Sequence, residues 1–292
     1  MPLSFDHLVL ASLDLTAQAQ IYANLGFQVG SRNQHPWGTQ NHIIQLDGTF
    51  LELIGVAPGA TMPGLHPAPR QFSFGGFIGT YLAHSQGLAM LVLNTQDARG
   101  DAARFKALGI GDFEPFHFSR AAQRPDGSLK EVAFTLAFAE SALIEDAGFF
   151  TCQHHNPENF WAAAAQIHPN SASKLTGAVM VAENPAEHAE FLAHFTGQRQ
   201  MLSTSMGLEI ELGEGKIEVL TPLAAQFRYG SAFEVAPDAK PHFCAFRVGV
   251  GSMAQARACL QASGVAALEF GGRLIVPDTA ALGVAVVFEL QT

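Results

Sequence analysis

The feature of this chain that most constrains its fold is a glutamate that recurs near the end of three similar segments. These segments close on Phe50–Ile54 (FLELI), Lys216–Leu220 (KIEVL) and Val287–Leu290 (VFEL). A fourth segment closes on Phe149–His154 (FFTCQH), with an amide near the corresponding place. An internal repeat determines the architecture of a chain before any local pattern does, so we predict a duplicated fold.

Each repeat has the same order of expected elements. In the first, the apolar run Phe5–Leu10 precedes a helix that Asp14 can cap and Gly26 can end, and three short strands follow. The later repeats begin near Leu88, Leu175 and His242. A single unit of this kind cannot bury both faces of its strands, whereas two units can curl around a shared cavity. We therefore predict an α+β fold in which four βαβββ modules pair into two open, strongly curved mixed β-sheets.

Two stretches separate the modules. Residues 57–85 are rich in Gly and Pro, and residues 156–173 lie between the second and third modules. We place the domain boundary in the latter stretch. This gives an N-terminal domain of residues 1–160 with modules one and two, and a C-terminal domain of residues 174–292 with modules three and four.

Charge and composition argue against two classes of partner. A net charge of −10 without a basic cluster argues against nucleic acid. No apolar run reaches the roughly 20 residues that a membrane span needs. Three cysteines without paired spacing, and a strand-like start in place of a signal peptide, lead us to expect a cytoplasmic protein. The expected partner is a small-molecule ligand. A homodimer is compatible with the sequence, which does not fix the oligomeric state.

The motifs of the first repeat carry a resemblance to a known superfamily. Asp6–Val9 (DHLV), Leu25–Phe27 (LGF), His35–Asn41 (HPWGTQN) and Phe50–Ile54 follow one another as in a module of the vicinal oxygen chelate superfamily. Nearly the whole chain resembles the four-module glyoxalase-like members, and Phe149–Trp161 looks like the end of their second module. This superfamily contains isomerases, lyases, ring-opening dioxygenases, epimerases and drug-sequestering proteins, so the fold does not select an activity.

The resemblance implies a site built from the first and last strands of paired modules. Module one offers His7 and Glu52, which can converge on a divalent ion such as Zn, Ni, Mn or Fe that holds two vicinal oxygens of a substrate. Module two departs from the pattern, because Met90 aligns with His7 and a thioether is a poor ligand for such ions. Its last strand offers Gln153, or His154 with a shift of one residue, to complete a three-ligand set.

These side chains also have other interpretations. His7 is equally explained as a half-buried strand histidine bonded to Asp6 or to the backbone. Without a metal, Glu52 could act as a general base or hold a polar ligand.

The loop His35–Asn41 is the second candidate feature. His35, Trp37, Thr39 and Asn41 could line the rim of a cavity and contact ligand, with Trp37 stacking on it. A rigid turn with backbone-bonded Thr39 and Asn41 explains the loop equally well. Arg32 could pair with a carboxylate ligand or be solvated.

The C-terminal modules keep the glutamates but not their partners. Ala178 or Val179 aligns with His7 in module three, and His242 and Cys244 lie near that place in module four. We expect a degenerate, structural copy of the pair. This disfavours a dioxygenase of the ring-cleaving (extradiol) type, which would need two histidines and one carboxylate.

Two functions therefore remain. One is metal-assisted isomerase or lyase chemistry in the N-terminal cavity, with His7 and Glu52 as catalytic residues. The other is non-catalytic binding or sequestration of an aromatic or amphipathic molecule. Whether the protein is an enzyme stays open at this point.

Overall fold

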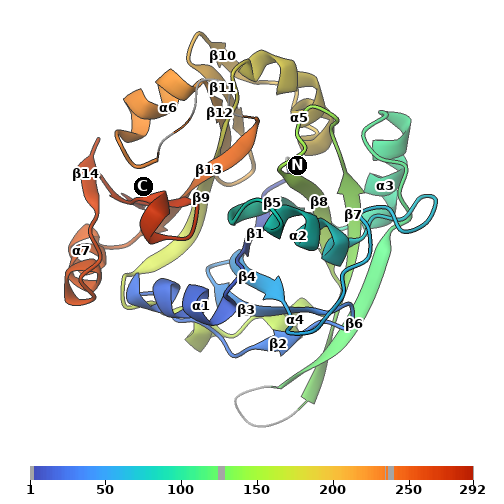
Figure 1. Ribbon diagram of the computed structural model, residues 1–292, viewed down its shortest axis with the longest axis horizontal. Coiled ribbons are helices and arrows are strands. Elements are labelled where there is room, and N and C mark those ends of the chain that lie inside the picture. Colours follow the sequence, from blue (N-terminus) through green and yellow to red (C-terminus); the bar gives the residue numbers. More distant parts are fainter. Residues whose placement is uncertain (1–2, 124–128, 234, 236–239, 292) are drawn as a thin grey trace.

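The computed structural model describes residues 3–123, 129–233, 235 and 240–291, which fold into two mixed sheets with helices packed against them (Figure 1). Each sheet has eight strands. The first, sheet A, is formed by modules one and two, and the second, sheet B, by modules three and four. The predicted α+β fold with paired modules is confirmed.

The two sheets have the same strand order. Sheet A runs β2 (Asn33–Gln34), β3 (Thr39–Gln45), β4 (Phe50–Val56), β1 (Phe5–Ala11), β5 (Gly87–Asn94), β8 (Gly148–His154), β7 (Leu129–Ala139), β6 (Phe116–Gln123). Sheet B runs β10 (Leu202–Thr204), β11 (Gly207–Glu211), β12 (Lys216–Leu220), β9 (Ala172–Val181), β13 (His242–Val250), β16 (Ala285–Leu290), β15 (Arg273–Val276), β14 (Leu268–Phe270). At each centre, the first strands of the two modules pair antiparallel, and each also pairs parallel with the last strand of its own module.

The helices are short and locally capped. They are α1 (Leu15–Asn24), α2 (Phe74–Leu82), α3 (Ala98–Ala107), α4 (Pro157–Phe160), α5 (Ala189–Thr196), α6 (Pro222–Tyr229) and α7 (Met253–Ala262), with 3₁₀ turns at Ala163–Gln166, Pro185–His188 and Asp278–Ala280. Asp14 and Asp97 cap α1 and α3 through their carboxylates, as a cap residue should. In both cases the cap's own N–H donates to a hydroxyl two residues earlier, on Ser12 or Thr95. None of the helices in the described residues could span a lipid bilayer.

The core has three parts. One hydrophobic cluster contains helix-side residues of both sheets and joins the two halves, for example through Phe149, whose ring contacts Phe191, Phe195 and Phe243. The other two clusters lie on the remaining faces. Helix α2 contributes to the cluster on sheet A, and helix α6 contributes to the cluster on sheet B. Residues 57–85, which the sequence indicated as a linker, thus contribute a helix that covers the sheet carrying His7 and Glu52.

Candidate functional site

A bulge in β1 brings two neighbouring side chains together. Along β1 and β5, Phe5 is opposite Leu93 and His7 is opposite Val92, so Asp6 is an extra residue without a partner position. In a regular strand, consecutive side chains point to opposite faces, and a bulge removes this alternation locally. His7 Nδ1 therefore lies 2.5 Å from Asp6 Oδ1, with both side chains buried.

Asp6 holds a second histidine as well. His154 Nε2 of β8 is 3.0 Å from Asp6 Oδ2. Burial of Asp6 would raise its pKa, but the charges and hydrogen bonds of His154 and His7 outweigh this and keep the pKa well below its usual range. An ionised carboxylate only accepts hydrogen bonds, so the Nδ1 atom of His7 carries its proton and the Nε2 atom faces the other way.

Glu52 lies on that other side. Its Oε2 is 3.7 Å from His7 Nε2, while its Oε1 accepts a hydrogen bond of 2.5 Å from Asn41 Nδ2. His35 Nε2 is 3.9 Å from Oε1. The sequence thus named Glu52 and the three side chains that the fold gathers around its carboxylate.

The loop before β3 is fixed by its own contacts. The Nδ1 atom of His35 is 2.8 Å from the Thr39 hydroxyl, and the Trp37 ring stacks on His35 with centroids 4.5 Å apart. Burial lowers the pKa of His35, the Arg120 charge adds to this, and Glu52 opposes it. Burial of His35 therefore favours its neutral form.

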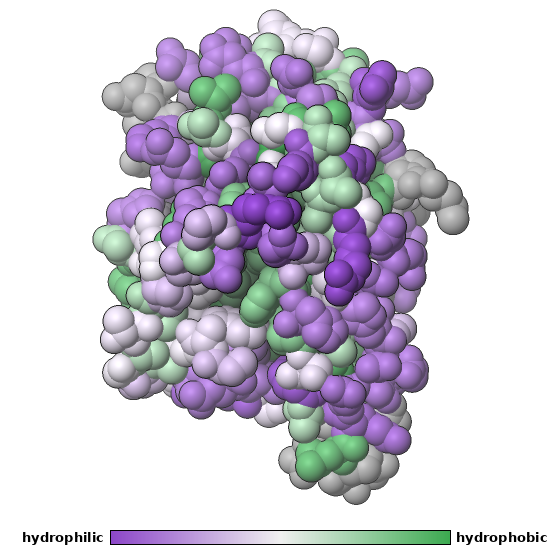
Figure 2. Space-filling model, turned by 90° about the vertical axis from the view of Figure 1, so that its right-hand side faces the viewer, coloured by the Kyte–Doolittle hydropathy of each residue, from purple (hydrophilic) through white to green (hydrophobic). Residues whose placement is uncertain are grey.

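These groups line a cavity of about 50 Å³ in sheet A. Its walls are largely aromatic, with rings from Trp37, Phe50, Phe74, Phe118, Phe134, Phe150 and Phe160. The outer face on the side of β6 and β7 is different, because hydrophilic residues cover most of it and hydrophobic ones appear in small groups (Figure 2). The aromatic character therefore belongs mainly to the inside of the sheet.

Two candidate residues lie elsewhere. Gln153 follows Cys152 in β8 and so points to the opposite face, where its amide bonds Gln96 O and Ala98 N at the start of α3. Arg32 bonds the Thr16 hydroxyl of α1 and approaches His42 at the exposed surface. Neither side chain lies among the groups around Glu52, so the structure places Gln153 and Arg32 apart from the other candidates.

At the two positions that correspond to His7 and Glu52, module two carries apolar side chains. Asp14 caps α1 seven residues after His7, and Asp97 caps α3 seven residues after Met90. This equal spacing supports the alignment of Met90 with His7. The register then places Phe150 at the position of Glu52, because Phe150 is opposite Val92 just as Glu52 is opposite Val9. Met90 and Phe150 are both buried apolar side chains, so these two positions supply no polar ligand.

This limits how well a metal fits. The 3.7 Å between His7 Nε2 and Glu52 Oε2 suits two ligands about 2 Å from one ion. Among the described residues, no third His, Cys, Asp or Glu forms a close donor group with these two: His35 Nε2 lies near Glu52 Oε1 but accepts a hydrogen bond from Asn41 Nδ2, and His154 Nε2 is paired with Asp6. A catalytic metal needs about three protein ligands, so this donor set does not fit a tightly held ion.

A second group of donors lies beside it. Ligand atoms of Asp6, Cys152 and His154 all lie within 4.8 Å of one another. Burial raises the pKa of the Cys152 thiol well above its usual value, and the charges of Asp6 and Glu52 add to this. This favours the protonated thiol, so a metal ion bound by this group would have to displace the thiol proton.

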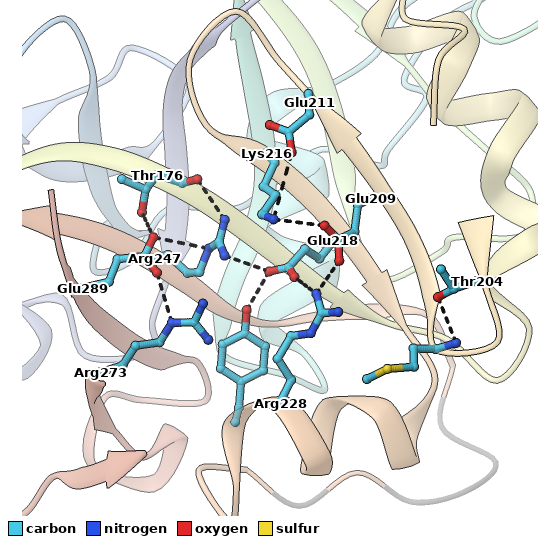
Figure 3. A network of polar contacts seen from close by, with 12 residues as sticks. Thr176, Thr204, Glu209, Glu211, Lys216, Glu218, Arg228, Arg247, Arg273 and Glu289 are labelled. Atoms are coloured by element: carbon cyan, nitrogen blue, oxygen red, sulfur yellow. Dashed lines mark hydrogen bonds and ion pairs between the residues drawn. The ribbon is translucent and has the colours of Figure 1, made fainter. Parts of the chain in front are cut away.

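In sheet B, a glycine stands at the position that corresponds to His7, and an arginine side chain fills the space above it. Glu218 is opposite Val179 as Glu52 is opposite Val9, which places Gly177 at the position of His7, one residue before the predicted Ala178 and two before the alternative Val179. Arg247 fills the space above this glycine, since a Cβ at Gly177 would lie 2.5 Å from Arg247 Nε. Its guanidinium pairs with Glu218 at 3.2 Å (Figure 3).

Both C-terminal glutamates are held in this network. Glu218 also accepts a 2.6 Å hydrogen bond from the Tyr229 hydroxyl and pairs with Arg228. Glu289 accepts from the Thr176 hydroxyl at 2.7 Å and pairs with Arg273 at 3.1 Å. The carboxylates are thus neutralised by the protein's own cations, as a structural copy of the site would be.

Sequence reasoning named Asp6 only as one possible partner of His7, without His154, and it did not identify Arg120. The Asp6-His7 dipeptide was visible, but the bulge that unites the two side chains was not. Arg120 lies on β6, far along the chain from the other polar groups, and no local motif marks it.

Comparisons with known proteins agree with the fold. A family model described as a glyoxalase-like domain matches residues 5–196. A hypothetical protein from Staphylococcus aureus is similar over 99% of this chain and 100% of its own, with a TM-score of 0.69 and 10% identity. A mutant 4-hydroxymandelate synthase from Streptomyces coelicolor is similar over 100% and 94%, with a TM-score of 0.55 and 12% identity. No curated protein matches the sequence. The chain belongs to the glyoxalase-like domain family, within the vicinal oxygen chelate superfamily.

Proposed function

We propose that the N-terminal cavity binds a small molecule with vicinal oxygens and that Glu52 and His7 move a proton on it, in isomerase or lyase chemistry. The observation that supports this is the buried Asp6–His7–Glu52 array, in which one imidazole lies between two carboxylates. Such an arrangement of an oriented imidazole and a second carboxylate is typical of acid–base sites.

Each group has a defined part in the proposed reaction. Glu52 takes a proton from a carbon next to a substrate carbonyl. In the form that carries a proton on both ring nitrogens, His7 donates the Nε2 proton to the carbonyl oxygen, so negative charge does not build up on that oxygen. Asp6 keeps the Nδ1 proton in place and orients the ring. Glu52 then returns its proton to the former carbonyl carbon of the resulting enediol, while His7 Nε2 takes the proton of the other hydroxyl, which completes the isomerisation and resets both groups. None of these steps needs a metal.

The alternative is a binding protein without catalysis. The observation that favours it is the apolar contribution of module two, where Met90 and Phe150 replace the polar groups of module one. An aromatic cavity of this kind holds a ligand without acting on it.

One experiment separates the two. Small hydroxyketones and hydroxyaldehydes are incubated with the protein in D2O, and exchange of the C–H proton next to the carbonyl is followed by NMR. We expect exchange with the wild type, loss of at least 10²-fold in Glu52→Gln, and no change in Arg32→Gln, which lies outside the cavity. Unchanged exchange in Glu52→Gln would refute the proton-transfer proposal. Binding without exchange in the wild type would favour the binding protein.

A further inference from the structure

One cation reaches the cavity from the far edge of sheet A. Arg120 lies on β6, the last strand of the sheet, yet its Nη1 donates a 3.3 Å hydrogen bond to Asn33 Oδ1 on β2, the first strand. The sheet therefore curls until its two edges meet at this contact. Among the described residues that line the cavity, Arg120 is the one arginine or lysine.

The contact continues to the proposed proton-transfer group. Asn33 Nδ2 donates to Asn41 Oδ1 at 3.2 Å, and Asn41 Nδ2 donates to Glu52 Oε1 at 2.5 Å. Amides thus link the guanidinium to the carboxylate without bringing the two charges into contact. Arg120 and Glu52 mark two separate poles of one cavity.

The guanidinium is poorly compensated where it lies. Burial lowers the pKa of Arg120 and the more distant charge of Glu52 partly opposes this, but a guanidinium stays charged at neutral pH. Within the described part of the chain, no carboxylate lies within 4 Å of it. A partly desolvated cation is stabilised by an anion, and a planar carboxylate matches the guanidinium fork with two parallel hydrogen bonds.

Flat apolar walls lie next to this pole. The Phe118 ring, two residues before Arg120, packs 4.9 Å from Trp37 and 5.2 Å from Phe134. A planar ring system can stack against such walls at little entropic cost.

We propose that the ligand is a compact aromatic carboxylate whose carboxylate pairs with Arg120 and whose ring lies among Phe118, Phe134 and Phe150. This orientation directs the substituent at the other end of the molecule toward Glu52 and His7. The inference rests on the proposed small-molecule site and adds the chemical class of its ligand.

The test compares benzoate with benzamide, which has the same shape without the charge, by isothermal titration calorimetry. We expect benzoate to bind wild type about 10- to 100-fold more tightly than benzamide, because a hydrogen-bonded charge pair is lost in the amide. Arg120→Gln should remove that difference, and Arg120→Lys should keep part of it by retaining the charge. Arg32→Gln is the matched control, since this arginine bonds Thr16 outside the cavity.

The outcomes separate this inference from the proposed function. Equal binding of benzoate and benzamide to the wild type, or a preference for benzoate that survives in Arg120→Gln, overturns the carboxylate assignment. Proton exchange that still depends on Glu52 would then leave the proposed function standing. If neither probe binds and no substrate exchanges, both are overturned.

Discussion

Replacement of Arg247 by methionine tests whether the C-terminal half has exchanged a ligand site for an internal ion pair. The side chains of Arg247 and Glu218 are only 5% and 1% exposed. Removing one member of a buried pair costs about 3–5 kcal/mol, because the other charge is left uncompensated. Glu218 keeps Arg228 and Tyr229, and Glu289 keeps Arg273, so we expect the lower end of this range, about 3 kcal/mol.

The assay is urea unfolding followed by circular dichroism for the wild type, Arg247→Met, Glu218→Gln and the double variant. The two single losses should not add. The double variant carries no uncompensated charge at this contact, so it should be more stable than the sum predicts by about 1–3 kcal/mol. Additive single losses below about 1 kcal/mol would refute the ion-pair reasoning, because they would mean that solvent or neighbours already compensate each charge.

The remaining predictions concern sheet A. The depressed pKa of Asp6 contributes stability that is present above the pKa of the unfolded chain, about 3.9, and is lost as pH falls toward the folded pKa. Asp6→Asn should therefore make stability less dependent on acid pH, which acid titration of the wild type and the variant measures. Burial lowers the pKa of His168, whose Nδ1 accepts a hydrogen bond from the Gln28 N–H. The stability that the neutral imidazole contributes should therefore be lost as pH falls from about 6.5 toward the folded pKa. In His168→Gln, pH titration of the unfolding midpoint should show a smaller change over that window. Phe150→His should increase zinc affinity at least about tenfold over Phe150→Leu in calorimetric titration, because this ring lies 5.5 Å from His7 and would add the missing third ligand; equal affinities would contradict our account of the donor set.

Local sequence signals predicted the fold well. The repeated order of elements, the cap residue Asp14 and the glutamates in β4, β12 and β16 depend on near neighbours in the chain, and these are what a sequence displays. His7, His35, Asn41 and Glu52 were found because module one follows a recognisable order along a short stretch. Their meeting around one carboxylate then follows from the pairing of β1, β3 and β4.

The positions that the sequence misplaced have a different cause: a sequence does not fix which residues of two neighbouring strands lie opposite each other. A shift of one residue sends a strand side chain to the other face, so Gln153 faces α3 while Cys152 faces the cavity. The same sensitivity moved the counterpart of His7 from Ala178 to Gly177. The bulge at Asp6 and the approach of Arg120 to Asn33 depend on how distant strands meet. No pattern within one strand encodes such contacts.

The aromatic contact between the two halves bears on how such a chain can be inherited. The buried ring of Phe149 packs against Phe191 and Phe195 of α5, a helix of the third module. The stretch shared with the glyoxalase-like family ends at residue 196, where α5 also ends. A gene fragment cut between modules two and three would encode the cavity but leave Phe149 exposed to water. The aromatic contact therefore makes the N-terminal pair of modules depend on packing against residues of the third and fourth modules.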